Sequence, residues 1–212
     1  MLVFEEGVDR DQSDSLETPA AVRRAKRMAR RLRFRRHLRR RLILGMLIEN
    51  GMCPLRPDEL EAWVRKDVFP KDNRAFVDWL KSTDTDNPYC DRAAAATHPV
   101  DKQTLGRAIY HLAQRRGFKS GRKDQSGEGE ETSQAAKELG EIKGNIKRLS
   151  DELARTALTL GQYFYNELKA GRKVRKNHTG RKEHYIPEWQ KIAEVQGLDK
   201  ELAERIARVL FS

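Results

Sequence analysis

The chain has 212 residues, of which 38% are hydrophobic and 35% are charged, and its formal net charge is +11. This composition excludes a disordered chain and is typical of a soluble protein with modest hydrophobic cores in one or two domains. No apolar run is long enough to cross a membrane, and the acidic N-terminus lacks the basic and then apolar pattern of a signal peptide. We therefore expect a cytoplasmic protein with no membrane partner.

Cysteine and histidine spacing gives no sign of a metal site. Cys53 and Cys90 lie far apart and match no metal-binding or redox motif, and the five histidines are scattered. We therefore assign no metal ligand and expect two inert thiols in a reducing compartment.

The N-terminal residues 1–17 are acidic, with six acidic residues and one arginine. Leu2, Val3 and Phe4 are apolar enough to form a short strand, but it has nothing in this sequence to pair with. We expect this segment to be the end of a structure that lies outside the sequence.

The next segment is the most distinctive of the chain. Between Ala21 and Arg41 it holds eleven arginines and one lysine and no acidic residue, so the rest of the chain is close to neutral. Thr18 and Pro19 are typical of a helix N-cap and first position, and Asn50-Gly51 is typical of a helix end. The pattern predicts one long helix within residues 18–51, about 45 Å in length at roughly 1.5 Å per residue.

Arginines at this density indicate an anionic partner. Like charges three or four residues apart destabilise an isolated helix by about 0.2–0.5 kcal/mol per pair, so something outside the helix must compensate. Phosphates do so best, because a guanidinium is a planar fork of donors that stays charged. A solvated charge run normally mixes signs, and a membrane-surface helix needs one broad apolar stripe that this segment lacks.

After Arg41 the helix changes character. The residues from Leu42 to Ile48 are almost all large and apolar, which predicts a buried helix end. We expect the helix to be anchored in a core here, with its arginine-rich part free to meet nucleic acid.

Downstream, apolar residues recur at helical intervals on both sides of a polar, acidic and glycine-containing stretch, residues 124–134. We predict an all-α fold with no sheet, in which the long helix is followed by two helical packets. The first packet has two short helices separated at residues 70–73 and a third helix that Gly117 ends. The second has one helical pattern that continues up to Gly171 and further helices after Pro187. The predicted core positions are Leu60, Trp63, Val64, Val68, Phe76, Trp79, Leu80, Leu105, Ala108, Ile109, Leu112, Leu139, Ile142, Ile146, Leu149, Leu153, Leu158, Leu160, Phe164, Leu168, Trp189, Ile192, Val195, Leu198, Leu202, Ile206, Val209 and Leu210.

Two further basic clusters follow helix ends. The second cluster of the chain is interrupted by small residues that would let backbone amides approach phosphates; a basic helix end with a solvated loop is the alternative. The third cluster has His178, His184 and Tyr185 interleaved, which suits unstacked bases; its alternative is a basic surface loop. The second cluster comprises Arg115, Arg116, Lys119, Arg122 and Lys123, and the third Lys169, Arg172, Lys173, Arg175, Lys176, Arg181 and Lys182.

Three stretches together resemble one family, the RNA-guided DNA endonucleases that are the effectors of type II CRISPR systems, in its compact subtype. RRAKRMARRLRFRRHLRRRLILGMLIENG resembles the arginine-rich bridge helix of that family. LGRAIYHLAQRRGFKSGRK resembles the helix and basic loop of its recognition lobe, and LTLGQYFYNEL with RKVRKNHTGRKEHYIPEWQKIAEVQ resembles the next recognition-lobe segment. The order and spacing match as well, and the resemblance covers almost the whole chain.

The resemblance implies a domain order. Residues 1–17, with LVFEEGVD, are similar to the end of the first RuvC-like segment, and residues 18–51 to the bridge helix. Residues 52–123 and 135–212 are expected to be two helical parts of the recognition lobe, joined by a flexible acidic linker at residues 124–134. VLFS stops where the family usually continues, so we expect a part of a larger protein.

The same resemblance implies which residues meet RNA. In this family the bridge helix binds the guide RNA along its seed portion, and the motif that Arg115 and Arg116 match, with Gly117 and Phe118, approaches the repeat-derived RNA duplex. Leu32 stands where some members have another arginine. The expected RNA-binding residues are Arg23, Arg27, Arg30, Arg31, Arg35, Arg36 and Arg39 in the helix and Arg115, Arg116, Lys119, Arg172, Lys173 and Arg175 in the two clusters.

The implied function is guide-RNA binding and positioning of an RNA–DNA heteroduplex within an RNA-guided endonuclease of prokaryotic antiviral defence. Partners would be the guide RNA (crRNA and tracrRNA), the target DNA and the nuclease domains of the parent protein. The catalytic aspartate and the HNH histidine of the family lie outside this sequence, so we expect the chain alone to be inactive, with no catalytic residue and no cofactor, although the parent would use Mg²⁺. The alternative is a stand-alone RNA-binding module, ribosome-associated or an RNA chaperone. A third hypothesis is an intact enzyme with an unrecognised site.

Overall fold

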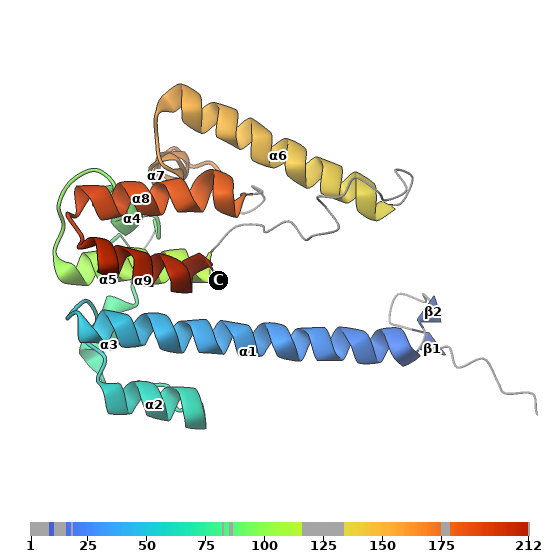
Figure 1. The fold of residues 1–212 in the computed structure, drawn as a ribbon, viewed down its shortest axis with the longest axis horizontal. Helices are drawn as coiled ribbons and strands as arrows, with labels where there is room; N and C mark the ends of the chain where they lie inside the picture. The colour runs from blue at the N-terminus through green and yellow to red at the C-terminus, as the bar shows by residue number, and fades with distance from the viewer. Residues whose placement is uncertain are drawn as a thin grey trace, which may run out of the picture. The chain divides into compact units, whose positions relative to one another are not determined.

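A computed structural model describes residues 9–10, 16–17, 19–81, 83–84, 87–115, 134–174 and 179–211 (Figure 1). The predicted N-terminal strand, nearly all of the predicted linker, and Arg116, Lys119 and Arg175 lie outside these residues. The chain forms two compact units, residues 1–40 and residues 41–212. No helix in the described parts is long and apolar enough to cross a membrane. The predicted domain boundaries after residues 17, 51 and 123 remain predictions.

The all-α prediction is confirmed, with one small addition. Two strands of two residues each, β1 (Asp9–Arg10) and β2 (Leu16–Glu17), pair in antiparallel fashion just before the long helix. The sequence predicts no sheet, because a pair of strands this short has no alternating pattern of apolar residues. Everything else with regular structure in the described residues is helical.

The long helix, α1, spans Pro19–Glu49, as predicted. Its C-terminus is closed by a Schellman motif, because the N–H of Gly51 donates to the carbonyl of Ile48 (3.0 Å) and the N–H of Met52 to that of Leu47 (2.8 Å). Gly51 has φ +67°, a left-handed conformation that glycine adopts without a Cβ penalty. The side chain of Asn50 also donates to the carbonyl of Met46 (2.8 Å), so the helix end is fixed locally.

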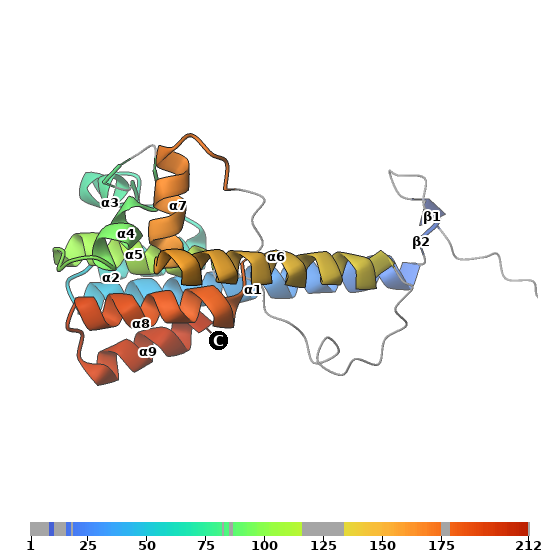
Figure 2. The ribbon, with the colours of Figure 1, turned by 90° about the horizontal axis from the view of Figure 1, so that it is seen from above.

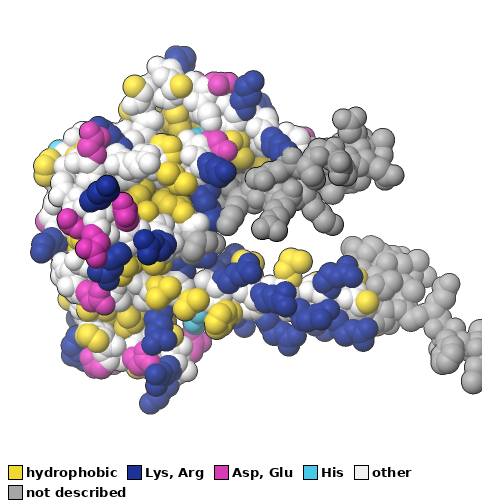
Figure 3. All heavy atoms as spheres, in the orientation of Figure 1, with side chains coloured by type: hydrophobic (Ala, Val, Ile, Leu, Met, Phe, Trp, Pro, Cys, Tyr) yellow, Lys and Arg dark blue, Asp and Glu magenta, His cyan; other side chains and the backbone are white. Residues whose placement is uncertain are grey.

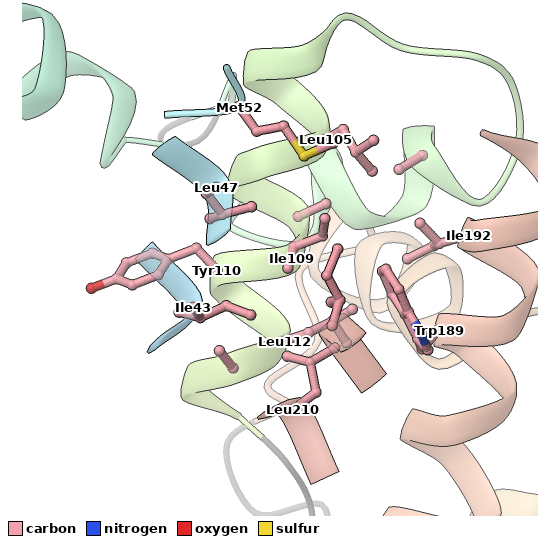
Figure 4. Close-up of a cluster of buried hydrophobic side chains, with 14 of the residues drawn as sticks. Ile43, Leu47, Met52, Leu105, Ile109, Tyr110, Leu112, Trp189, Ile192 and Leu210 are labelled. Carbon is pink, nitrogen blue, oxygen red and sulfur yellow. The ribbon is translucent and has the colours of Figure 1, made fainter. Parts of the chain in front are cut away.

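The last part of α1 is anchored in the core of the second unit. Ile43, Leu44 and Leu47 are completely buried. Figure 4 shows Ile43 and Leu47 beside Ile109 and Leu112 of α5 (Lys102–Gln114). Buried aliphatic side chains of this kind each contribute about 1.5–3 kcal/mol, so this packing fixes the C-terminal part of α1 to the unit.

The first predicted packet contains α2 (Pro57–Lys66), α3 (Arg74–Trp79), α4 (Cys90–Ala95) and α5. Asn73 caps α3 by accepting a hydrogen bond from the N–H of Phe76 (3.0 Å). The break between the two short helices is confirmed. Three expectations were wrong: Val68 lies beyond α2 and is exposed, Leu80 is exposed as well, and α5 ends at Gln114, three residues before Gly117. Helix α4 was not predicted, because its alanine-rich sequence has no amphipathic pattern.

The second predicted packet contains α6 (Gln134–Thr156), α7 (Leu160–Lys169), a π-helical turn (Arg181–Tyr185), α8 (Ile186–Val195) and α9 (Lys200–Phe211). The helical pattern expected to continue up to Gly171 is broken at Ala157, which has φ +53°. Thr159 then begins α7 through a capping box with Gln162, a local signal that is present in the sequence.

The two packets share one core. Helix α4 packs against α5, α7 and α8, and α9 packs against α5 and α8 (Figures 1 and 2). Trp63, Trp79 and Trp189 are buried, as expected. Cys53 is buried as well, and this burial raises the pKa of its thiol to about 11, which agrees with the expectation of an inert thiol.

Candidate nucleic-acid interface

The arginine-rich part of α1 is exposed along its whole length. Every residue from Arg23 to Arg36 is exposed, and Arg39 is half-buried. Figure 3 shows Lys and Arg side chains gathered over this helix, with hydrophobic side chains among them. The six predicted contacts Arg23, Arg27, Arg30, Arg31, Arg35 and Arg36 are therefore all accessible to a partner.

These arginines have no internal counter-charge in the described residues. None of the arginines from Arg23 to Arg36 forms an ion pair there, whereas Arg41, one turn further on, lies 3.2 Å from Glu61 of α2. At the end of the helix, Glu49 lies 3.5 Å from Arg205 of α9. Without an ion pair in the described residues, the arginines from Arg23 to Arg36 keep their mutual repulsion until an anion binds.

The arginines surround much of the helix instead of forming one stripe. At about 100° per residue, Arg23, Arg27 and Arg30 fall on one side, and Arg36 falls nearly opposite. Arg31 and Arg35 lie between these directions. A polyanion that contacts all of them must approach the helix from more than one side. Arg24, Lys26 and Arg33 are exposed as well, so the helix offers three accessible cations beyond those predicted.

Of the second basic cluster, the structure describes Arg115, which is exposed just beyond the C-terminus of α5. It lines a cavity of about 200 Å³ together with Arg107, Tyr110 and His111. Burial lowers the pKa of His111 well below its usual value, and the nearby Arg92 and Arg115 act in the same direction. His111 is thus neutral at pH 7, and Arg115 supplies the positive charge at this helix end.

Two arginines of the third cluster, Arg172 and Arg181, make contacts within the protein. Arg172 forms a two-pronged ion pair with Glu167 (2.7 and 2.6 Å), and the hydrogen bonds from Arg172 lower the pKa of Glu167. Arg181 is buried and donates to the carbonyl of Phe211 (2.8 Å). Lys173 is exposed.

The structure contradicts the prediction that His184 and Tyr185 of the third cluster stack on bases. Tyr185 and His184 are buried, with 3% and 2% of their surface exposed. They follow three charged residues in the sequence, and both are buried at the end of a π-helical turn. Periodicity at the α-helical interval does not detect such a turn.

The charge pattern of the described residues offers no metal site. No group of three or more His, Cys, Asp and Glu side chains lies close enough there to hold a metal ion.

Comparisons with known proteins relate this fold to one group of solved structures. No protein-family model and no curated protein matches the sequence. The chain superposes on Corynebacterium diphtheriae Cas9, solved in complex with sgRNA and target DNA, with a TM-score of 0.62 and 21% identity over 99% of this chain and 23% of that chain. It superposes on Campylobacter jejuni Cas9 in complex with sgRNA and target DNA with a TM-score of 0.59 and 19% identity, over 95% of this chain and 27% of that chain. For St1Cas9 in an assembly with sgRNA, target DNA and AcrIIA6, the TM-score is 0.59 and the identity 19%, over 93% of this chain and 22% of that chain.

The resemblance to the CRISPR effector endonucleases is thus confirmed at the level of the fold. Sequence identities of 19–21% show a common fold and leave activity and partners to be argued from the residues. The chain spans about a quarter of the length of these solved proteins.

Proposed function

We propose that this chain binds guide RNA through α1 and positions an RNA–DNA heteroduplex as part of an RNA-guided DNA endonuclease. The observation that carries the proposal is the run of exposed arginines from Arg23 to Arg36 without an ion-pair partner in the described residues. Guanidinium groups bind phosphates in the two-pronged geometry that RNA backbones offer at every nucleotide.

The solved structures support the choice of partner. The Cas9 proteins whose fold this chain shares are described in complex with sgRNA and target DNA. In RNA-guided systems base pairing reads the sequence, while the protein recognises the backbone and the A-form shape of the heteroduplex. A helix with arginines around its circumference suits this task, because it offers phosphate contacts in several directions and few base-reading groups.

The parent protein would supply the chemistry. By the family resemblance, the RuvC-like and HNH centres and their Mg²⁺ would lie outside this chain, which would act in a prokaryotic cytoplasm in antiviral defence. The role of this chain would be binding and positioning, with Arg115 and the exposed Lys173 as further contacts.

A binding competition tests this proposal. We expect the chain to bind a guide-type RNA, and that RNA paired with its DNA complement, more tightly than the B-form DNA duplex of the same sequence, because the A-form backbone is the recognised feature. Equal affinity for all three would show a non-specific polyanion site and would contradict the heteroduplex role.

The second candidate is a stand-alone RNA-binding module, for which the arginine helix alone would suffice. Genomic position separates the two. A repeat array and spacer-acquisition genes beside the gene would favour the endonuclease, and a position among ribosomal genes would favour the module.

A further inference from the structure

A large aromatic side chain stands among the arginines of α1. Phe34 is 67% exposed, although phenylalanine is usually buried. Its neighbours one helical turn away are Arg30 and Arg31 on one side and Leu38, 44% exposed, on the other. Figure 3 shows hydrophobic side chains of this helix lying among Lys and Arg side chains.

Phe34 lies on an arginine-rich side of α1. At about 100° per residue, it shares this side of the helix with Arg23, Arg27 and Arg30. The ring therefore lies at the C-terminal end of a row of arginines that have no ion-pair partner in the described residues.

The charges around Phe34 decide what can cover it. An apolar protein surface would have to take Arg30 and Arg31 out of water without compensation, which is strongly unfavourable. A nucleotide can cover the ring and also compensate the charges. Its base is a flat aromatic surface, and its phosphate carries the negative charge that the guanidinium groups need. Proteins that bind single-stranded nucleic acid combine the same two elements, aromatic rings for stacking and cations along the backbone.

We propose that Phe34 stacks on an unpaired base of the bound RNA, while Arg30 and Arg31 hold the phosphates beside it. The inference rests on the proposed function and adds a contact to a base, where the arginines contact only the backbone. A base inside a heteroduplex is covered by its neighbours on both faces, so the ring requires a nucleotide in a single-stranded segment or a loop.

Three substitutions at this position separate stacking from simple apolar contact. Phe34→Ala and Phe34→Leu are expected to weaken binding of a single-stranded RNA of about 20 nucleotides by roughly five- to hundredfold, since a base stacked on an aromatic ring is lost. Phe34→Trp is expected to keep the affinity, because indole is also a flat aromatic ring. The slope of log affinity against log salt concentration should be the same in all four proteins, because no phosphate contact changes.

Two controls accompany this series. Met28→Ala removes a side chain that is 64% exposed and lies about 120° away around the same helix, and it should not change the affinity. The same RNA paired with its DNA complement should bind wild type and Phe34→Ala within about twofold, since its bases are not accessible. Circular dichroism should show unchanged helicity, because alanine is a better helix former than phenylalanine.

The outcomes distinguish this inference from the proposed function. Loss of single-stranded RNA affinity in the Ala and Leu variants, with retention in the Trp variant, supports stacking. Retention of affinity in the Leu variant would overturn stacking and indicate an apolar contact, as a protein partner would make. Unchanged affinity in all Phe34 variants would also overturn it, while the arginines continued to bind RNA. Failure of the wild-type chain to bind any RNA would remove the proposed function together with this contact.

Discussion

Arg92 of α4 and Glu188 of α8 form an ion pair in which both side chains are completely buried. The guanidinium Nε of Arg92 donates to Oε1 of Glu188 (2.9 Å), and the same oxygen accepts the backbone N–H of Gly161 (3.1 Å). A Cβ at Gly161 would overlap Oε1 of Glu188, so the close approach of α7 to this pair requires glycine. The guanidinium also lies over the rings of Tyr89 (5.2 Å) and Tyr185 (5.3 Å). The pair thus holds α4, α7 and α8 together.

Breaking this pair should destabilise the protein strongly. Arg92→Met is expected to lower the free energy of unfolding by about 3–5 kcal/mol, because it leaves the carboxylate of Glu188 buried without its cation. The double variant Arg92→Met/Glu188→Leu should recover part of the loss, since neither charge then remains in the core. Urea denaturation of the three proteins measures both effects. This account would be contradicted if the free energy of unfolding of Arg92→Met lay within about 1 kcal/mol of the wild-type value.

Acid should destabilise the fold through His184. Its Nδ1 accepts the backbone N–H of Gly180 (3.0 Å), so Nε2 carries the proton and donates to Oγ of Ser150 (2.9 Å), which in turn donates to the carbonyl of Ile146 (3.0 Å). This chain of hydrogen bonds needs a neutral imidazole. Burial also lowers the pKa of His184 below its usual 6.5.

Because the folded pKa of His184 is the lower one, the unfolded chain binds more protons below pH 6.5. The stabilisation is complete above that pH and is lost as the pH falls toward the folded pKa, by up to about 1.4 kcal/mol per pH unit. The free energy of unfolding, measured by urea denaturation between pH 7 and 5, should therefore fall, and it should fall less steeply in His184→Gln. Equal slopes would assign the acid sensitivity to other groups, of which His111 is the first to test.

Binding of a structured guide RNA should depend strongly on salt. Each phosphate contact releases counterions and adds roughly 0.7–0.9 to the log–log slope. With about six arginines of α1 engaged, the affinity should fall by about a thousandfold between about 50 and 200 mM salt. Fluorescence anisotropy at four or more salt concentrations measures this slope. A nearly flat titration would show that the arginines do not contact phosphates.

The double variant Arg31→Ala/Arg35→Ala should weaken binding of guide RNA by about 1.5–3 kcal/mol per contact, with the helix intact or slightly more helical. Arg172→Ala/Lys173→Ala should cost less, because Arg172 is already paired with Glu167. Affinity and melting temperature are measured on both double variants.

A matched control is Arg65→Ala/Arg155→Ala, which removes the same charge from two exposed arginines that pair with Glu61 and Glu152 in their own helices. It should leave RNA affinity nearly unchanged. A destabilised Arg31/Arg35 variant with unaltered RNA affinity would mean that these arginines brace the fold, and the binding assignment of α1 would then fail.

The purified chain should show no Mg²⁺-dependent cleavage of guide-matched DNA. This expectation rests on the proposed function, in which the nuclease centres belong to the parent protein. Incubation with guide RNA, matched DNA and Mg²⁺, followed by electrophoresis, checks this. Cleavage that survives repeated purification and disappears with EDTA would contradict the binding role as the sole activity.

The sequence by itself determined the long helix and its chemistry. Pro19 at the first position, the Schellman end at Asn50 and Gly51, and the change from arginine to aliphatic residues at Leu42 are all local signals, and the structure confirms what each predicts. Local signals suffice here because caps and side-chain periodicity act within one or two turns of the helix. The break before α7 was equally local, in the capping box of Thr159, and could have been predicted.

Only the tertiary structure decided which polar residues are available to a partner. Arg172 became paired, His184 and Tyr185 became buried, and Arg92 found Glu188 at 96 residues' separation. The composition of a basic cluster is the same whether its members face solvent or the core, and the distinction depends on which helices pack together. The same dependence made Phe34 informative, because an exposed ring is recognisable only once the core that excludes it is known.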